Sequence, residues 1–424
     1  MVECDKQRGF RCLSLRIEAY SERNLERGNE KQMLVYLDNS ATTRQYDQVT
    51  DAMAEAMRET YGNPSSLHSL GVAAEKKVRQ ARKALASAFG ASEDEIYFTS
   101  GGTESDNTVL AGAAGARKRT GRKIIVSAVE HPAVLEPARR LEKAGFEVEY
   151  IGVDRHCHLD MDQLEAALTE DTILVSVMGV NNEAGTIMPI GEIARLKDKY
   201  NKAHGTKIWL HSDAVQALGK IPVSVKKEWQ GVDFISASGH KIHGPKGIGV
   251  MYVRKGINIE SFMVGGGQER HMRSGTENTP GIIGFGLAAR MASESFAERT
   301  AAMAAARNYL LEGVRREIPD AVVNSPEDET CCPSVLNVSF LGTRGEVILH
   351  TLEQDGIFVS TGSACSSNKK GQSHVLTAMG LNDKEIESAI RFSFSEFNTI
   401  EEMDYVLDKV KKAVTRFRKL GSFR

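Results

Sequence analysis

Apolar residues follow one of two spacings along most of the chain, and the two spacings alternate from about Asp47 onward. One set has the spacing of a helix that Gly90 is placed to end: Ala74, Val78, Ala81, Leu85 and Phe89. Short apolar runs predict strands at residues 96–99, 124–127, 148–151, 173–178, 208–211, 234–237 and 249–253. Most of these runs are separated by segments long enough for a helix. This alternation predicts a largely parallel sheet with helices on both faces.

The pattern changes after about residue 280. A long alanine-rich helical region is expected over 284–317. It is followed by strand-like runs and a last amphipathic segment: 335–340, a helix from about Glu346, 358–361, 390–394 and a final helix. We therefore predict an α/β fold, with a large, doubly wound, mostly parallel sheet domain and a small α+β C-terminal domain joined by a long helix.

A chain of 424 residues is long enough for two such domains. The large domain is expected over residues 48–290 and the small one over 291–424. Residues 33–47 are expected to pack with the small domain. Residues 1–32 are polar and mixed in charge, and are expected to be a disordered extension.

Charge and hydropathy argue against two classes of partner. The formal net charge is only -2, which gives no field that would gather a nucleic-acid backbone or an anionic membrane. No apolar run approaches the roughly 20 residues that are needed to cross a bilayer. The first 33 residues contain no apolar stretch of the kind that a secretory signal requires. We therefore expect a cytoplasmic protein.

The cysteines have neither the spacing of a disulfide framework nor that of a metal site. In a cytoplasmic chain, free thiols are the expectation, and no metal is expected. The six residues concerned are Cys4, Cys12, Cys157, Cys331, Cys332 and Cys365.

Polar or glycine-rich segments follow three of the predicted strands. Residues 100–103 (SGGT) lead into a helix that residues 104–106 open. Glycine there lets the backbone approach a ligand, and free N–H groups at the helix start attract a phosphate. Asp213 follows another strand, a position that also suits a simple helix cap. Lys241 follows a third, between a histidine and a glycine-rich turn. Because open α/β sheets bind ligands at the carboxyl ends of their strands, these segments together indicate a ligand site.

Residues 238–249 (SGHKIHGPKGIG) resemble the lysine segment of the NifS/IscS-type cysteine desulfurases. These enzymes belong to the class V aminotransferase group of fold-type I pyridoxal-phosphate (PLP) enzymes. The resemblance runs in order from residue 36 to about residue 407. Its other motifs are YLDNSATT (36–43), GNPSSLH (62–68), TSGGTESDN (99–107), EHPAVL (130–135), VNNEAG (180–185), HSDAVQ (211–216), GGGQERHMRSGT (265–276), STGSACSS (360–367) and IRFSFS (390–395).

The resemblance implies a role for each residue around the cofactor ring. Lys241 would form a Schiff base with PLP and then move the substrate proton. Asp213 would pair with the ring nitrogen and keep it protonated. His131 would stack on the ring and serve in proton transfer, with an ordinary buried histidine as the alternative. Gln216 and Asn182 would contact the phenolic oxygen of the ring.

The same resemblance implies how the cofactor phosphate is held. Thr103, Ser238 and His240 would bind it, and Gly102 would permit the close approach of the backbone. In this family a threonine from the partner subunit completes the phosphate pocket, and Thr276 stands in the matching motif. A homodimer is thereby implied.

Two further residues would act on the substrate. Arg391 matches the arginine that, with Asn182, binds the substrate carboxylate, a task that suits a planar guanidinium. Its alternative is an ordinary surface ion pair. Cys365 matches the nucleophile, which attacks the sulfur of bound cysteine as a thiolate and keeps it as a persulfide. Its alternative is a buried structural thiol.

The function that the resemblance implies is conversion of L-cysteine to L-alanine, with the sulfur passed to an acceptor protein. The acceptor would serve iron–sulfur cluster assembly or tRNA thiolation. Rival interpretations are a selenocysteine lyase, another class V PLP enzyme, and a non-catalytic sulfur-transfer scaffold. Selenocysteine turnover needs no attacking thiol, so Cys365 favours cysteine, and the intact Lys241 motif argues against a scaffold.

Two departures from the commonest family pattern bear on the acceptor. Lys369 and Lys370 follow Cys365, where small residues and a proline are more usual. Residues 395–397 (SEF) replace the commoner glycine–arginine–phenylalanine, and we expect them to alter the surface beside Arg391.

Overall fold

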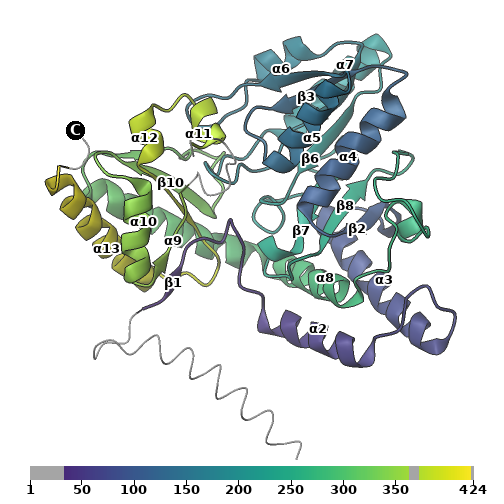
Figure 1. Cartoon of the computed structure of the whole chain (residues 1–424), viewed down its shortest axis with the longest axis horizontal. Coiled ribbons are helices and arrows are strands. Elements are labelled where there is room, and N and C mark those ends of the chain that lie inside the picture. The colour runs from purple at the N-terminus through teal and green to yellow at the C-terminus, as the bar shows by residue number, and fades with distance from the viewer. Residues whose placement is uncertain (1–32, 362–371, 422–424) are drawn as a thin grey trace, which may run out of the picture.

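The structure, a computed structural model, describes residues 33–361 and 372–421. Its largest layer is a seven-stranded sheet with strand order β2-β8-β7-β6-β5-β3-β4 (Figure 1). β8 runs antiparallel to both of its neighbours, and the other pairs are parallel. The strands are β2 (Ile96–Thr99), β3 (Lys123–Ser127), β4 (Glu147–Ile151), β5 (Thr172–Ser176), β6 (Trp209–Asp213), β7 (Phe234–Ser238) and β8 (Gly249–Val253). Each predicted strand of this sheet is confirmed, with bounds that differ by at most two residues.

Helices cover both faces of this sheet because its strands are apolar on both sides. In β3, Ile124 and Val126 pack into a core with α4 and α5, whereas Ile125 packs into the opposite core with α3, α7 and α8. The predicted helix that ends at Gly90 is confirmed, and Gly90 has the left-handed φ of 65° that glycine tolerates best. The helices of this unit are α2 (Asp47–Glu59), α3 (Ser69–Phe89), α4 (Gly102–Arg117), α5 (Pro132–Lys143), α6 (Met161–Ala167), α7 (Ile190–His204) and α8 (Thr279–Glu294).

A second core lies around a three-stranded antiparallel sheet of order β12-β10-β9, toward the C-terminal end of the chain (Figure 1). Val35 and Leu37 are fully buried in this core, because β1 pairs in parallel with β11. Its elements are β1 (Val35–Tyr36), α9 (Phe296–Glu317), β9 (Ala321–Val323), β10 (Val335–Phe340), α10 (Gly345–Gln354), β11 (Ile357–Phe358), β12 (Ala389–Ser393) and α13 (Ile400–Lys419). Two short helices, α11 (His374–Ala378) and α12 (Asp383–Glu387), precede β12, and Val375 and Leu376 of α11 are buried in the core of the large sheet.

The single long helix predicted over 284–317 is wrong. The segment forms two helices, α8 and α9, that meet at Ser295, where φ is -110° and ψ is 23°. The Ser295 hydroxyl donates to the Met291 carbonyl at 2.9 Å. Serine competes in this way for the carbonyls of the preceding turn, which weakens a helix locally. The run of apolar residues continues through the break, so the spacing alone did not reveal it.

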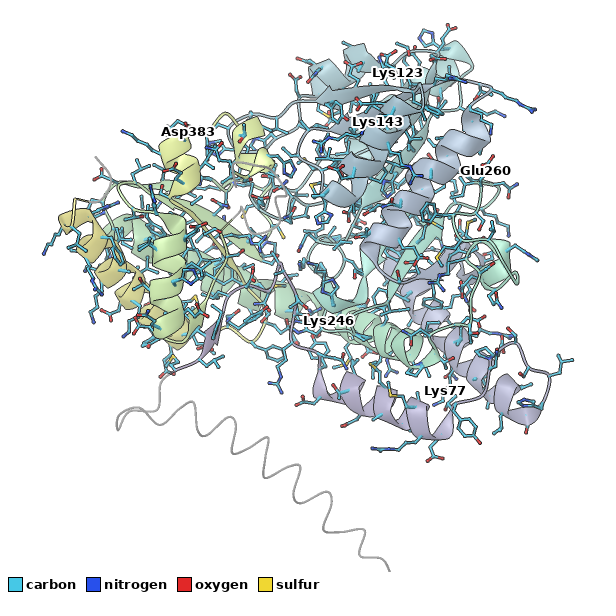
Figure 2. The ribbon with its side chains drawn as sticks, in the orientation of Figure 1. Lys77, Lys123, Lys143, Lys246, Glu260 and Asp383 are labelled. Carbon is cyan, nitrogen blue, oxygen red and sulfur yellow. The ribbon has the colours of Figure 1, made fainter. Side chains whose placement is uncertain are left out.

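The outside of the fold carries charges of both signs, for example at Lys77, Lys143, Lys246 and Asp383, all of them exposed (Figure 2). Among the helices of residues 33–361 and 372–421, none is long and apolar enough to cross a membrane.

Candidate functional site

A cavity of about 290 Å³ opens at the carboxyl ends of the parallel strands. Strand geometry explains this placement, because the polar residues follow directly after buried apolar runs. Every predicted cofactor- or substrate-binding residue except Thr276 lines it: Gly102, Thr103, His131, Asn182, Asp213, Gln216, Ser238, His240, Lys241 and Arg391.

Lys241 lies in η2 (Gly239–Lys241), the turn that follows β7. Its Nζ donates to the carbonyl oxygens of Ser40, at 2.5 Å, and Ala41, at 2.8 Å. The same turn is tied to the N-terminal segment by the amide of Thr43, which donates to the His240 carbonyl at 3.0 Å. The lysine therefore faces the cavity from a turn that a second part of the chain holds in place.

Asp213 ends β6 and is buried, and its Oδ1 accepts a hydrogen bond from the Val215 amide at 2.8 Å. Burial, together with the nearby Asp106 carboxyl, raises the pKa of Asp213 to about 7. Asp106 is itself buried, which raises its pKa to about 7, and its Oδ1 lies 3.5 Å from Nε2 of His211. Two carboxyl groups in one dry region favour a cationic partner in the cavity, such as a protonated ring nitrogen.

His131 caps α5, and its Nδ1 accepts from the Ala133 amide at 3.1 Å. This hydrogen bond places the proton of the neutral ring on Nε2. Burial, together with the positive charge of Lys241 and the neighbouring His374, lowers the pKa of His131 to about 4. The imidazole is therefore neutral near pH 7 and suits stacking on an aromatic ligand.

Gly102, Thr103, Ser238 and His240 lie together at the start of α4 and form what we call the anion-binding corner. A Cβ added to Gly102 would lie 2.5 Å from Cγ2 of Val215, so only glycine fits there without a shift. Thr103 lies in the first turn of this 16-residue helix, whose first N–H groups are available to a ligand. Ser238 and His240 line the same cavity from the end of β7. These donors suit a phosphate.

Arg391 lies on β12 and is almost fully buried. Its NH1 donates to the Asn182 carbonyl at 3.0 Å, and its NH2 pairs with Oδ1 of Asp38 at 2.8 Å. Its Nε is buried and forms no hydrogen bond within the described part of the chain. The guanidinium is thus fixed by two partners and keeps a donor for a ligand such as a carboxylate.

The residues present fit PLP. Three buried polar atoms on residues that line the cavity have no hydrogen bond within residues 33–361 and 372–421: Ser40 Oγ, Asp106 Oδ1 and Arg391 Nε. Such atoms are costly unless a ligand or water satisfies them. The start of α4 complements a phosphate, Asp213 a cationic ring nitrogen, and Lys241 an aldehyde carbon. Across the described ranges, no group of three or more His, Cys, Asp or Glu side chains is arranged to hold a metal ion.

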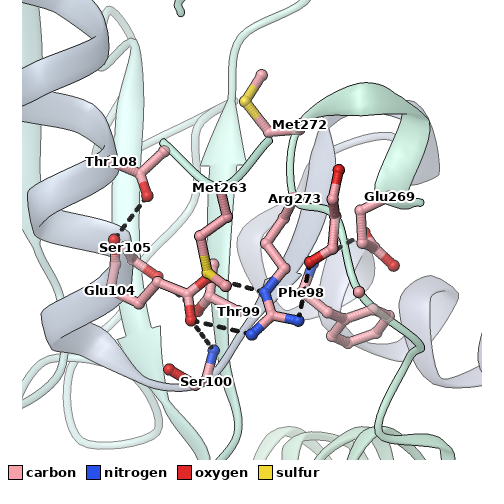
Figure 3. A network of polar contacts seen from close by, with 12 residues as sticks. Phe98, Thr99, Ser100, Glu104, Ser105, Thr108, Met263, Glu269, Met272 and Arg273 are labelled. Carbon is pink, nitrogen blue, oxygen red and sulfur yellow. Dashed lines mark hydrogen bonds and ion pairs between the residues drawn. The ribbon is translucent and has the colours of Figure 1, made fainter. Parts of the chain in front are cut away.

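Thr276 is exposed and does not line the cavity that contains Lys241. It lines a separate hollow of about 260 Å³ with Ser100 and Arg273. Arg273 holds this segment against the anion-binding corner, since its Nε donates to Oε1 of Glu104 at 2.9 Å while Glu104 accepts from the Ser100 amide (Figure 3). Glu269 adds a second attachment, accepting from the Phe98 amide at 3.0 Å (Figure 3). Thr276 therefore belongs to a fixed segment that faces outward.

Cys365 lies outside the described residues, as do Lys369 and Lys370. The chain on both sides is placed near the cavity. Ser360 exchanges two backbone hydrogen bonds with Arg391, at 2.7 and 3.1 Å. On the other side, His374 Nε2 donates to the carbonyl of Glu130, the residue before His131, at 2.9 Å.

Residues 395–397 were expected to alter the surface beside Arg391, but Glu396 is mostly buried. Its side chain is 13% exposed and turns inward, where it pairs with Arg299 at 2.8 Å and with Nε2 of His243 at 3.2 Å. The Tyr46 hydroxyl also donates to it. Glu396 thus connects β12 with helix α9 and with the residues that follow Lys241. Phe397, at 57% exposure, is the member of this segment that faces solvent.

Replacing Glu396 with glutamine is expected to destabilise the fold by about 3 kcal/mol near pH 7, because Arg299 then loses a buried partner. Burial alone would raise the pKa of Glu396, but His243 and Arg299 lower it well below its usual range. A lowered folded-state pKa means that the carboxylate stabilises the fold above the unfolded pKa of 4.5 and loses this effect as the pH falls. Urea unfolding midpoints should therefore differ strongly at pH 7 and less at pH 3, which lies between the unfolded and the folded pKa. Glu312→Gln, at an exposed position of α9, is the control and should change neither midpoint.

Three residues of the site had no role assigned from the sequence: Asp38, Ser40 and Asp106. All three stand inside the motifs quoted above. Asp106 follows Thr103 by three positions, which places both on one face of α4. This spacing could have identified Asp106 as a site residue from the sequence alone. The pairing of Asp38 with Arg391 joins residues 353 positions apart, and no local pattern reveals it.

The chain matches one known protein family and is similar to several known proteins. The family described as "Aminotransferase class-V" matches residues 35–406. A protein named "Cysteine desulfurase IscS", from Methanosarcina thermophila, is 44% identical over 387 residues, which cover 91% of this chain and 93% of that protein. A solved structure described as "NIFS-LIKE PROTEIN" superposes with a TM-score of 0.84 at 41% identity, covering 91% of this chain and all of that one. The structure "SspA in complex with cysteine" has a TM-score of 0.74 at 31% identity, covering 86% of this chain and all of that one.

Proposed function

The chain belongs to the aminotransferase class V family and is a cysteine desulfurase whose family cofactor is PLP, and from this premise we propose which residues perform the reaction. Lys241 holds the cofactor, Arg391 binds the carboxylate of L-cysteine, and Cys365 takes the sulfur. The observation that carries the proposal is that Lys241, Asp213 and Arg391 line one cavity although they come from three separate strands or strand ends.

The cofactor, when bound, supplies an electron-accepting ring. The protein's part is to bind, orient and move protons. Asp213 keeps the ring nitrogen cationic, because a buried carboxylate with a raised pKa is stabilised by a cation. Gln216 and Asn182 would contact the phenolic oxygen, and Thr103, Ser238 and His240 would bind the phosphate. Lys241 Nζ and the neutral ring of His131 hold and transfer the substrate proton, and the lining of one cavity by both residues supports this.

Arg391 explains why an amino acid with a free carboxylate is the substrate. Asp38 and Asn182 fix its guanidinium, so its orientation is set before the substrate arrives. The similar structure described as SspA in complex with cysteine supports L-cysteine as the substrate here.

Arg391→Lys is expected to raise KM for L-cysteine by roughly ten- to a hundredfold, because an ammonium cannot grip both carboxylate oxygens. The PLP spectrum should be unchanged, since the cofactor contacts are elsewhere. Steady-state kinetics checks this, with Arg290→Lys, on the exposed face of α8, as the control. An unchanged KM would show that Arg391 does not bind the substrate carboxylate.

The length of the chain allows Cys365 to act at this cavity. It follows Ser360 by five positions, a span of at most about 17 Å, and Ser360 is hydrogen-bonded to Arg391. The cysteines of residues 33–361 are less suited, because none of them lines the cavity. Burial raises the pKa of Cys331 to about 11 and that of Cys157 further, whereas a thiolate is the competent nucleophile.

The sulfur step balances without another reactant. The carbon–sulfur bond of L-cysteine breaks as a sulfur–sulfur bond to Cys365 forms, and the carbon takes up a proton to give L-alanine. Incubation with L-cysteine and no reductant, followed by peptide mass spectrometry, tests this assignment. The peptide with residue 365 should gain the mass of one sulfur atom. Gain on any other cysteine peptide instead would remove Cys365 from the proposal.

The protein acts as a homodimer in which Thr276 completes the phosphate site of a second copy. Its exposed position on a fixed segment supports this, as do large exposed apolar side chains that remain to be covered, among them Tyr61, Leu67 and Val264. The acceptor of the sulfur is a protein of iron–sulfur cluster assembly or of tRNA thiolation, and the free thiols of Cys157, Cys331 and Cys332 support a cytoplasmic location.

The proposed division into domains rests on the two cores, except that Val375 and Leu376 of the C-terminal part are buried in the core of the large unit. Residues 48–290 form the large unit around the seven-stranded sheet, and residues 291–424 the small one. Residues 33–47 belong with the small unit, because Val35 and Leu37 are buried in its core. Residues 1–32, a disordered extension in this division, lie outside the described residues.

A further inference from the structure

Lys220 is a lysine buried just behind the cavity wall, and none of the roles above employs it. It is 5% exposed and lies in the turn after β6, four residues beyond Gln216. Its Nζ donates to Oε1 of Gln216 at 2.5 Å. Lysine is rarely buried unless it is paired, and here its partner is a neutral amide.

This contact settles which way the Gln216 amide points. The two ends of a glutamine amide are nearly interchangeable in shape, but the carbonyl oxygen of Ser40 can only accept and a lysine ammonium can only donate. Oε1 must therefore face Lys220, and Nε2 must face the other way. Nε2 does donate to the Ser40 carbonyl at 2.9 Å, the same oxygen that accepts from Lys241.

The orientation leaves Gln216 with a hydrogen-bond donor for the cavity. Nε2 carries two protons, and Ser40 accepts one of them. Gln216 lines the cavity, so the second proton is available to a ligand oxygen. A turned amide would present the lone pairs of Oε1 instead, and these would repel an anionic oxygen.

We propose that Lys220 is a positioning residue for the cofactor, which holds Gln216 with its amide N–H toward the phenolic oxygen of PLP. This inference rests on the proposed contact between Gln216 and that oxygen. Charge supports it as well, because burial lowers the pKa of Lys220 to about 7 and an anionic ligand nearby would favour the ammonium form. The region already gathers positive groups, with Lys241, Arg299 and Arg391 close to Lys220.

A double-mutant cycle on PLP affinity tests the proposal. Lys220→Met keeps the length of the side chain and removes its donors, and Gln216→Met removes the amide. Apoprotein of each variant is titrated with PLP, and thermal unfolding of the same apoprotein reports whether it is folded. We expect Lys220→Met to weaken PLP binding about tenfold, the usual cost of one hydrogen bond to a charged group. The double variant should be no weaker than Gln216→Met alone, because Lys220 acts through Gln216.

The results distinguish an error in the role of Lys220 from an error in the contact assigned to Gln216. If Lys220→Met weakens binding equally with and without Gln216, Lys220 acts independently and the positioning role is wrong. If Gln216→Met binds PLP like the parent protein, the contact assigned to Gln216 is wrong, while the desulfurase assignment stands.

Two further measurements test the role of Lys220 even if a variant is less stable than the parent protein or does not fold. Lys220→Met and Gln216→Met should shift the visible absorption maximum of bound PLP in the same direction, which a general loss of stability would not do. If Lys220→Met does not fold, Lys220→Gln replaces it. That variant still has an N–H to donate, so its loss of affinity should be smaller than that of Gln216→Met, and an equal or larger loss would contradict the role.

Discussion

Replacing Cys365 with alanine is expected to lower sulfide release from L-cysteine by roughly a thousandfold or more while leaving the PLP content unchanged. In the proposed reaction the Cys365 thiolate accepts the sulfur, and no cysteine of residues 33–361 lines the cavity to replace it. The residues proposed to bind the cofactor, Lys241, Asp213 and those at the start of α4, are unchanged in this variant. Sulfide assay with a reductant present, together with the visible spectrum, measures both properties.

Cys331→Ala is the matched control for this substitution. Cys331 is half-buried, and burial raises the pKa of its thiol to about 11, so it is a poor nucleophile near pH 7. Sulfide release should be unchanged in this variant. Full sulfide production by Cys365→Ala would show that another group takes the sulfur, even if the cofactor assignment is right.

Replacing Lys241 with alanine is expected to abolish the visible absorption band of the enzyme-bound cofactor and to lower activity by at least about 10²–10⁴-fold. Without Nζ, the protein lacks the amine that we propose for the covalent bond to PLP, and it lacks the group that we propose to move the substrate proton. The spectrum after dialysis and the rate of alanine formation report the two losses separately.

Lys246→Ala controls for charge in the same region, because Lys246 follows Lys241 by five positions and is exposed. It should retain both the band and the rate. Retention of the visible band by Lys241→Ala would mean that a different lysine holds the cofactor, and Lys220 would be the first to examine, since Gln216 brings it close to the same cavity.

The fold was largely predictable because its strands are short apolar runs between helices. Alternating burial within β3 shows why, since Ile124, Ile125 and Val126 are all buried on one face or the other. The break at Ser295 was not predictable from spacing, because the apolar pattern runs through it and one serine hydroxyl decides the geometry. The inward turn of Glu396 depends on Arg299 and His243, which are distant in sequence.

Some residues of the site could likewise be predicted from the sequence, and others could not. Residues that follow strands, such as Asp213 and Lys241, were found because the sheet brings strand ends together. Lys220 was missed, because a lysine in a sequence is expected to be solvated and only the packing around Gln216 shows it buried. Thr276 could be placed only by family resemblance, since nothing within one chain brings it to the cavity.

The most direct test of the central claim is to measure alanine formed from L-cysteine by the purified protein supplied with PLP and a reductant. We predict L-alanine and sulfide in equal amounts, together with a visible absorption band that Lys241→Ala lacks. Formation of alanine from selenocysteine but not from L-cysteine would move the enzyme to a selenocysteine lyase. Absence of both the band and alanine after added PLP would contradict the account, and would favour a sulfur-transfer scaffold that has kept the fold without the chemistry.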